Sequence, residues 1–390
     1  MDVTFLNPVY WPEVRRGSER VVRELADGLI AAGHRPRLIT SATSRPSTTV
    51  EDGLAVQRVW RPPIEGRLRR RLYEDHLAHV PFTYLALRRG ARPDVAQALY
   101  ATDAATALRY RRDSGVPVVF SYMGLPHRVS LANRRMRKEL VSAACEQSDA
   151  VVALSELAAE HFRTWLGVDP HVIAPPVDVH TFTPADDPAA ARHADPTILC
   201  AADHTQTRKR VALLVQALAI VRRTHPRARL VLTRAAGTAT ATTSAPWAGV
   251  DFIDELDLDD RGALITANRA AWVHALPSVG EAFGLVLAEA LACGTPVVGA
   301  QAEVVGQDDG TGVLFPATED DPAALARALL EAIALAQDPA TAPACVARAQ
   351  RFSRQACTDA HLALYRSLGA DAGHTPGAHS AGPGSQTTDA

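Results

Sequence analysis

The stretch from Pro277 to Pro296, PSVGEAFGLVLAEALACGTP, most constrains the fold because it predicts a loop that runs into a buried helix. Good helix formers occupy residues 285–293, Gly294 can take the left-handed conformation that ends a helix, and Pro296 prevents continuation. We therefore expect the helix to begin near Gly284. The N–H groups of its first turn have no partner within the helix, so this end suits a phosphate.

Two glutamates lie eight positions apart in this stretch, one before the helix and one within it. Glu289 stands in an apolar run, where a carboxylate is costly unless it is hydrogen-bonded. It shares a helix face with Leu285 and lies roughly 6 Å further along, where a ligand with phosphates on the first turn would place ribose hydroxyls. Glu281 precedes the helix and could reach whatever is attached beyond the phosphates. Alternatively, the stretch is a core helix in which the Glu289 side chain extends to solvent and Glu281, near the N-terminus, interacts favourably with the helix dipole.

This pattern, with Phe283-Gly284 between the glutamates and Cys293-Gly294-Thr295-Pro296 after them, resembles the E-x7-E element of the retaining glycosyltransferases of family 4. The resemblance implies an α/β fold of the GT-B type, in which two Rossmann-like domains face each other across a cleft and a C-terminal helix crosses back. It also implies a donor site in which the first-turn amides of residues 283–285 bind the diphosphate. Glu289 would then bind the nucleotide ribose, and Glu281 would approach the donor sugar.

A basic segment, Arg208-Lys209-Arg210, precedes an apolar helix and adds to the expected donor site. Three cations beside a helix N-terminus are unfavourable for the dipole unless an anion is present, and a diphosphate would supply one. Family 4 has a Lys at the start of this helix, and it matches Lys209, which we expect to be catalytic together with Glu281. The family's Arg falls at Asp203 here, so Arg208 or His204 is expected to replace it.

The acceptor side is expected in the first domain. Gly17 lies at the turn from a strand into a helix, with Ser18 as the N-cap, and could admit an anion or an acceptor hydroxyl. A glycine needed only for the turn is the alternative. The family has a His near the donor sugar where this chain has Met123, and His127 is expected to replace it unless it is a surface loop histidine.

The resemblance covers residues 1–368, and the domains follow from it. We expect an acceptor-binding domain over 1–182, a nucleotide-sugar-binding domain over 183–352, a returning helix over 353–368 and a disordered tail over 369–390. The Pro- and Asp-rich segment 170–195 is expected to be an extended linker. Strands are expected at 3–6, 36–40, 94–98, 117–122, 149–155, 197–201, 230–233, 250–253, 271–275 and 297–298, and further helices at 156–166, 322–336 and 352–368.

Composition restricts the remaining possibilities. A chain of 390 residues that is 47% hydrophobic can build two cores, and its net charge of -2 gives no indication of nucleic-acid binding. The five cysteines are widely spaced without a C-x-x-C pair, which argues against a disulfide framework or zinc site and favours a reducing cytosol. Neither a secretory signal nor an apolar run of about 18 residues is present, so we expect a cytoplasmic protein.

A D-x-D string at Asp257-Leu258-Asp259 is the pattern with which glycosyltransferases of the other main fold hold Mn or Mg. Acidic residues are ordinary at helix starts, and we expect this string to begin a helix that runs to Ala267. The expected enzyme therefore has no metal site and no cofactor besides its nucleotide-sugar co-substrate.

The resemblance implies a metal-independent, retaining hexosyltransferase that moves sugar from a UDP- or GDP-sugar to a small hydrophilic acceptor. Lysine occurs only at positions 138 and 209, and this Arg-rich composition is compatible with natural-product biosynthesis. One alternative is a membrane-surface glycosyltransferase that acts on a lipid or polyprenyl acceptor through the basic, largely helical segment 61–89. The others are a nucleotide-binding GT-B protein without transfer activity and a sugar-nucleotide epimerase.

Overall fold

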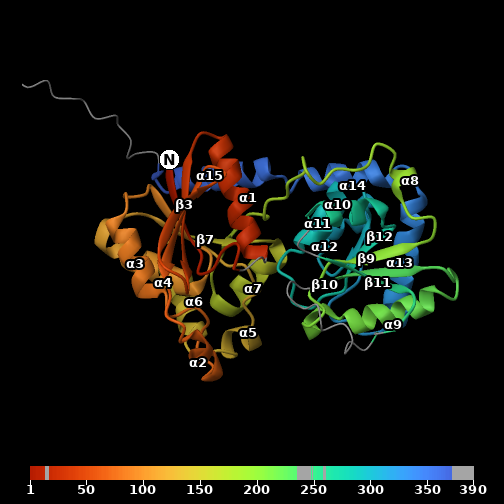
Figure 1. The fold of residues 1–390 in the computed structure, drawn as a ribbon, viewed down its shortest axis with the longest axis horizontal. Coiled ribbons are helices and arrows are strands. Elements are labelled where there is room, and N and C mark those ends of the chain that lie inside the picture. Colours follow the sequence, from red (N-terminus) through yellow and green to blue (C-terminus); the bar gives the residue numbers. More distant parts are fainter. Residues whose placement is uncertain (14–16, 235–246, 248, 258–260, 371–390) are drawn as a thin grey trace, which may run out of the picture.

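The computed structural model describes residues 1–13, 17–234, 247, 249–257 and 261–370. Two α/β units lie side by side, each with a sheet between layers of helices (Figure 1). Their strands read as buried apolar runs because helices cover both sheet faces.

The first unit is an 8-stranded sheet in the order β3-β4-β2-β1-β5-β6-β7-β8. All its pairs are parallel except the β3–β4 hairpin at one edge. The strands are β1 Asp2–Leu6, β2 Arg35–Ala42, β3 Ser47–Glu51, β4 Leu54–Trp60, β5 Val95–Ala98, β6 Val118–Ser121, β7 Ala150–Ala153 and β8 His171–Val172. The helices are α1 Gly17–Ala31, α2 Glu65–Arg70, α3 Val80–Arg89, α4 Ala101–Ser114, α5 Arg128–Ala132, α6 Arg137–Gln147 and α7 Glu156–Leu166.

The second unit is a 6-stranded parallel sheet in the order β11-β10-β9-β12-β13-β14. Its strands are β9 Thr197–Cys200, β10 Arg229–Arg234, β11 Ile253–Asp257, β12 Val273–Leu276, β13 Val297–Gly299 and β14 Gly312–Leu314. Its helices are α8 Pro188–Ala191, α9 Val211–Val221, α10 Arg261–Ala270, α11 Leu285–Ala292, α12 Ala302–Val305, α13 Pro322–Gln337 and α14 Thr341–Gln350, with 3-10 turns at η1 Thr207–Lys209 and η3 Gln307–Asp309.

The last helix, α15 Arg354–Ser367, returns to the first unit, as the family resemblance implied, and packs against α1 (Figure 1). Its apolar side chains Cys357, Leu362 and Tyr365 are buried in the core of the first unit. The chain leaves and re-enters that unit at one point, because the Val177 amide donates to the Phe352 carbonyl at 2.8 Å and the amide of Arg354 donates to the Val177 carbonyl at 2.9 Å. The sheet of the first unit ends at Val172 and that of the second begins at Thr197, on either side of the expected boundary at 182.

Several local expectations were wrong. Ser18 is the second residue of α1 and not its N-cap. The helical pattern expected over 61–89 is present in α2 and α3, whereas residues 71–79 between them form an irregular link that includes a bridge between Tyr73 and Arg135. The expected strand at 250–253 is displaced to β11, so that Asp257 ends a strand instead of beginning a helix, while residues 258–260 lie outside the described ranges.

The expected linker at 170–195 contains the short elements β8 and α8, and its Phe182 is completely buried. Of the expected tail, residues 371–390 lie outside the described part of the chain. No helix in the described ranges combines the length and hydropathy that crossing a bilayer requires.

Candidate functional site

Helix α11 begins as the sequence predicted, with Gly284 as its N-cap. Gly284 takes φ 89°, a left-handed conformation that favours glycine, and its carbonyl accepts from the Leu287 amide at 2.9 Å. The helix ends before Gly294, also left-handed at φ 80°. The first turn therefore directs its amide groups at the loop edge of the sheet, where open α/β sheets bind ligands.

The N-terminus of α1 faces the N-terminus of α11 across the gap between the units. A Cβ at Gly17 would lie 3.9 Å from Cδ1 of Leu285. Ser18 is nearly buried beside this contact, and its hydroxyl lies 3.3 Å from the hydroxyl of Tyr100 at the carboxyl end of β5. Two helix dipoles thus place their positive ends at one point, which favours an anion there.

Lys209, Arg208 and Glu281 meet at the same place. Lys209 Nζ donates to Glu281 Oε2 at 2.7 Å, and Arg208 Nη1 donates to the same oxygen at 3.3 Å. The Lys209 side chain is only 12% exposed, whereas that of Arg208 is 46% exposed. The structure therefore brings together the two predicted catalytic residues, and Lys209 is the more enclosed of the two cations.

Glu289 lies on the buried face of α11 and is 3% exposed. Its Oε1 forms an ion pair with Arg20 of α1, a contact between the two units. Its Oε2 is buried and has no hydrogen-bonding partner among the described residues. Burial, followed by the nearby charge of Arg261, lowers the pKa of Arg20 to about 10, so the guanidinium stays charged at neutral pH. One carboxylate oxygen is thus held in position while the other lacks a protein donor.

A network of charged residues at the junction of the units surrounds this pair. Arg354 of α15 donates to Glu24 Oε2 at 2.5 Å and contacts Asp178 at 3.0 Å. Arg261 of α10 contacts the same two carboxylates, each at 3.1 Å. Burial alone would raise the pKa of Asp178, but the hydrogen bond from Thr181 and the two arginines outweigh it and hold that pKa below its usual range. The orientation of α1 against α10 is therefore set by matched charges.

The N-terminus of α7 provides a second contact between the units. Ser155, its N-cap, accepts from the Ala158 amide at 3.1 Å and donates through Oγ to the Ala282 carbonyl at 2.6 Å. The amide of Glu156 donates to Glu303 Oε2 at 3.0 Å. The loop that carries Glu281 is thereby attached to the first unit directly.

Residues from both units line a cavity of about 430 Å³. The first unit contributes Gly17, Ser18, Arg20, Val21, Tyr100, Met123 and Leu154. The second contributes Asp203, Gln206, Arg208, Lys209, Glu281 and residues 282–286, so the predicted donor residues line it, except that Glu289 is reached through Arg20.

The residues at the expected Arg position have structural contacts of their own. Asp203 builds a turn instead, since it accepts from the Thr205 amide at 3.0 Å and from Gln206 Nε2 at 2.8 Å. Burial alone would raise the pKa of Asp203, but these hydrogen bonds outweigh it and keep the pKa low. His204 packs edge-on against Trp247, with ring centroids 5.6 Å apart.

The third cation of the basic segment, Arg210, has a structural role. It is left-handed at φ 55°, where a glycine would be unstrained, and its guanidinium donates to the Ala317 carbonyl at 3.1 Å and stacks over Phe315. Arg210 therefore holds the loop after β14 and is not among the described residues that line the cavity.

His127 is the N-cap of α5 and not a cavity residue in the described structure. It forms a capping box with Ser130, whose amide donates to Nδ1 at 3.4 Å, and its ring centroid lies 6.3 Å from that of His161. Partial burial, followed by the charge of His161, lowers the pKa of His127. Met123 lines the cavity where the family has its His.

Sequence reasoning missed Arg20, Tyr100 and Ser155. Each of these residues makes its contact at the site with a partner more than 80 positions away in the sequence. The signal available for Arg20 was a cation in the first turn of a helix, where it opposes the dipole unless a carboxylate neutralises it.

Within the described ranges, no group of three or more His, Cys, Asp or Glu side chains is arranged to hold a metal ion. The cavity brings the first-turn amides of α11 together with Lys209, Arg208 and Glu281, and Glu289 lies behind its lining residue Arg20. Such an arrangement can neutralise a diphosphate and offer hydrogen-bond acceptors to hydroxyl groups flanking it.

Comparison with known proteins agrees with this geometry. The family model described as Glycosyltransferase Family 4 matches residues 15–181, and the one described as Glycosyl transferases group 1 matches residues 195–334. Among the curated relatives, the D-inositol 3-phosphate glycosyltransferase of Kribbella flavida is 31% identical in an alignment 381 residues long that covers 88% of each chain. That of Kineococcus radiotolerans is 35% identical in an alignment 255 residues long that covers 57% of this chain and 58% of the relative. The chain thus spans little more than half of the latter relative's length.

Solved structures with the same architecture include sucrose-phosphate synthase from Thermosynechococcus elongatus, with a TM-score of 0.77 and 22% identity over 95% of this chain and 99% of that one. The Anabaena protein HepE in complex with UDP-glucose has a TM-score of 0.72 and 18% identity over 94% of this chain and 100% of that one. These likenesses confirm the GT-B fold that the sequence predicted.

Proposed function

The chain belongs to glycosyltransferase family 4, and we propose that it moves a hexosyl group from a nucleoside diphosphate sugar, UDP- or GDP-linked, to a small hydrophilic acceptor with retention of anomeric configuration. The observation that carries the proposal is the pairing of Lys209 with Glu281 where two helix N-termini meet. A diphosphate there interacts with Lys209 and the α11 amides, while the buried Oε2 of Glu289 accepts from the ribose.

The proposed chemistry requires little of the protein besides charge stabilisation. The acceptor oxygen attacks the anomeric carbon from the face that the diphosphate leaves, so a C–O bond forms as the sugar–phosphate C–O bond breaks. The electron pair of the broken bond goes to the diphosphate, and a phosphate oxygen takes the acceptor proton. Lys209 and the helix amides stabilise the negative charge that grows on the diphosphate. We propose that no metal takes part, because these groups already supply positive charge.

The acceptor is expected to bind against the first unit, near Gly17, Ser18, Tyr100 and Met123. The name of these relatives, D-inositol 3-phosphate glycosyltransferase, supports a small polyhydroxylated acceptor. Those relatives come from species such as Kribbella flavida and Actinosynnema mirum, and natural-product biosynthesis is the proposed setting.

The test begins with thermal shift of the full chain against UDP-, GDP-, TDP- and ADP-sugars, because a ligand of the folded state raises apparent stability. The best donor is then incubated with and without a panel of polyols and polyol phosphates, and release of nucleoside diphosphate is followed together with product mass. We expect acceptor-dependent release that saturating EDTA leaves unchanged.

Other results would identify the competing functions. Conversion of the donor sugar without an acceptor would indicate an epimerase, and tight donor binding without turnover on any acceptor would indicate a binding protein. Loss of turnover in EDTA with recovery in Mn or Mg would indicate a metal-dependent enzyme and favour metal binding by the D-x-D string at Asp257.

A further inference from the structure

One end of the first unit concentrates positive charge in a chain that is nearly neutral overall. Segments 67–72 and 128–138 together hold nine basic residues and no acidic one, against a net charge of -2 for the whole protein. Six of these basic side chains are exposed: Arg67, Arg70, Arg71, Arg128, Arg135 and Lys138. Within the described chain none of the six has an ion pair with a carboxylate, so their positive charge is not neutralised there, although the Arg135 guanidinium lies over the Tyr73 ring, 5.6 Å from its centroid.

The two segments form one continuous surface, which we call the basic face. The Arg135 amide donates to the Leu72 carbonyl at 2.7 Å, and the Glu74 amide donates to the Arg135 carbonyl at 3.0 Å. Arg137 stabilises this contact between the two segments by donating to both carboxylate oxygens of Glu74, at 2.5 and 2.6 Å. Helix α5, which carries Arg128, packs on α6, and Figure 1 shows α2 and α5 at the same end of the unit.

Large apolar side chains stand exposed among these charges. Val129 is 69% exposed, Leu72 55%, Met136 46% and Ile64 45%. Leu72 and Met136 are also left-handed, at φ 61° and 69°, although such bulky residues rarely adopt that conformation. The backbone is thus held in an unfavourable conformation at both positions where the segments join, and the apolar side chains remain in water.

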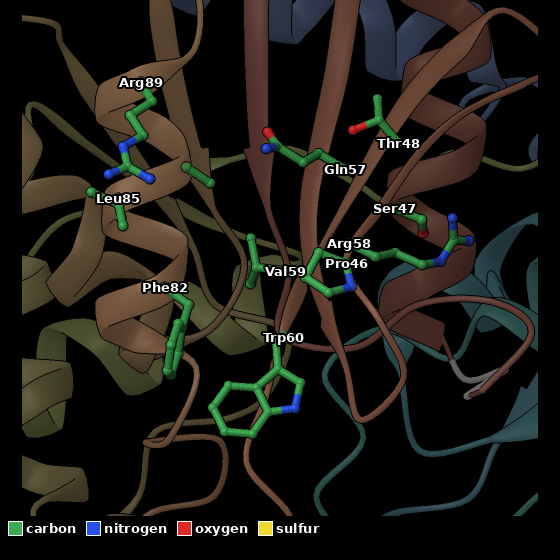
Figure 2. A pocket seen from close by; sticks show the side chains of 11 residues that line it. Pro46, Ser47, Thr48, Gln57, Arg58, Val59, Trp60, Phe82, Leu85 and Arg89 are labelled. Atoms are coloured by element: carbon green, nitrogen blue, oxygen red, sulfur yellow. The ribbon is translucent and has the colours of Figure 1, made fainter.

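A groove beside the basic face adds an aromatic pair. Figure 2 shows Trp60 and Phe82 at the end of this groove between β4 and α3, and their rings meet edge to face at 5.2 Å. Trp60 and Leu85 are each 40% exposed, and Arg89 lies on the same helix face as Leu85 (Figure 2). The chain runs from Trp60 at this groove through Ile64 into α2, which carries Arg67 and Arg70 of the basic face.

We propose that the basic face is a docking surface for an anionic lipid membrane. Clustered arginines are attracted to the surface potential of anionic lipids, and exposed apolar and Trp side chains partition into the boundary between headgroups and acyl chains. A nucleic-acid partner would use the charges but would leave Val129, Leu72, Met136 and Ile64 without a role, so the observations favour the membrane. The inference does not depend on the proposed acceptor.

The face lies close to the proposed acceptor side of the cleft. Met123 lines the cavity, and α5 begins five residues later at Arg128. Docking through this face would therefore position the mouth of the cavity near the membrane surface without blocking the second unit.

The test measures binding of the full chain to vesicles by flotation, with phosphatidylcholine alone or with a third of phosphatidylglycerol. The charge variant replaces Arg67, Arg70 and Arg71 with Ser, and its matched control replaces Arg223, Arg227 and Arg327, exposed arginines of the second unit. The apolar variant is Leu72→Ser with Val129→Ser, matched by Leu157→Ser with Trp165→Ser on α7. Circular dichroism and the thermal shift given by nucleoside diphosphate show that each variant is folded.

We expect binding to the anionic vesicles only, reduced by 0.5 M NaCl. Each basic residue near such a surface contributes about 1 kcal/mol, so the charge variant should bind roughly a hundredfold more weakly while its control binds at most a few-fold more weakly. The apolar variant should bind more weakly than its own control. The proposal is overturned if the wild type does not float with anionic vesicles, if patch and control variants lose binding equally, or if the protein binds single-stranded RNA but not vesicles.

Discussion

Glu281 and Glu289 are chemically identical, yet their surroundings assign them different partners. Glu289 is buried on α11 with Oε2 unpartnered among the described residues, whereas Glu281 is paired with Lys209 on the loop before the helix. Glu289→Gln should therefore weaken binding of free nucleoside diphosphate tenfold or more, since a hydrogen bond to a charged group contributes about 1.5 to 3 kcal/mol. Glu281→Gln should keep that affinity and slow transfer by a similar factor.

Calorimetry with the nucleoside diphosphate and steady-state rates measure the two effects, and Glu319→Gln, on the loop after β14, is the matched control. If Glu281→Gln loses diphosphate affinity while Glu289→Gln keeps it, the ligand lies in the opposite direction along α11.

Lys209 is the enclosed cation of the site, and its charge is best placed to stabilise the departing diphosphate. Lys209→Ala should lower kcat about a hundredfold to a thousandfold, because one such donor contributes about 3 to 4 kcal/mol in the transition state. Arg208→Ala, which removes a more exposed cation from the same carboxylate, should cost less. Single-turnover rates at saturating donor separate the effect on chemistry from that on binding, and a folded Lys209→Ala protein with near-native kcat would remove Lys209 from the mechanism.

His274, in the core of the second unit, should make the protein sensitive to acid. Its Nδ1 donates to Asn268 Oδ1 at 2.8 Å and its Nε2 accepts from the Ala201 amide at 3.3 Å, so the neutral ring is the one that fits. Burial lowers the pKa of His274 from 6.5 to about 3. Below about pH 6.5 the unfolded state therefore binds a proton that the folded state does not, and stability falls as pH falls, by at most about 1.4 kcal/mol per unit.

Urea unfolding at pH 7 and pH 5 checks this. His274→Gln should be less stable at pH 7 but should lose up to about 2 kcal/mol less between the two pH values. The exposed His171→Gln should show the wild-type loss, and an equally steep loss in His274→Gln would exclude His274 as the source. Burial also lowers the pKa of His361 to about 4, so part of the acid sensitivity should remain.

At the scale of elements, close packing between α1 and α15 rests on one glycine. A Cβ at Gly28 would collide with the hydroxyl of Thr358 and lie 3.1 Å from its Cβ and 3.3 Å from Cγ of Arg354. Gly28→Ala should therefore destabilise the protein by about 1 to 3 kcal/mol, the usual cost of overpacking, despite the better helix propensity of alanine.

Thr358→Ala removes the colliding hydroxyl and should recover part of that loss in the double variant, as measured by denaturant unfolding. Gly66→Ala, where a Cβ would meet nothing within 4 Å, is the control and should be nearly neutral. Additive effects of Gly28→Ala and Thr358→Ala would show that the two helices are not coupled at this point.

Elements were predictable where the pattern was complete within one segment. Helices α11 and α13 carry good helix formers together with their own stop or cap, and the buried strands are short apolar runs. The β3–β4 hairpin was missed because β3, Ser47–Glu51, is polar and mostly exposed, and α14 was missed because Pro343 stands in its first turn.

The site was predictable only where its residues are close in sequence. Lys209, Glu281 and Glu289 lie in local motifs, whereas Arg20 meets Glu289 across 269 positions and Glu24 meets Arg354 across 330. No local pattern indicates such pairs. His127 was assigned to the site from its place in the chain, and the structure gives it a helix-capping role because Ser130 lies within reach.

At the scale of the molecule, the Arg20–Glu289 pair connects ligand binding to the arrangement of the units. Arg20 holds Oε1, and in the proposed donor site Oε2 binds the ribose, so Arg20→Ala would leave a buried carboxylate without its protein partner. We expect Arg20→Ala to weaken nucleoside diphosphate binding tenfold or more and Arg20→Lys to restore part of it.

A double-mutant cycle with Glu289→Gln, measured by calorimetry, tests the connection. The two losses should be markedly less than additive, because both changes remove the same oriented acceptor. The matched control is Arg23→Ala, which changes an arginine three residues further along α1 that is paired with Asp27. Strictly additive losses would mean that Arg20 acts on the ligand independently of Glu289.

The double crossing at Val177 and Arg354 means that the second unit is topologically an insert within the first. The segments by which the chain enters and leaves the second unit are joined by two backbone hydrogen bonds. Both described ends of the chain, residues 1 and 370, lie in the first unit. In the proposed function the second unit recognises the donor, so we expect it to be exchangeable between family members at these two adjacent junctions. Such an exchange would combine a new nucleotide preference with an unchanged acceptor surface, and the two hydrogen bonds at Val177 would form around either version of the unit.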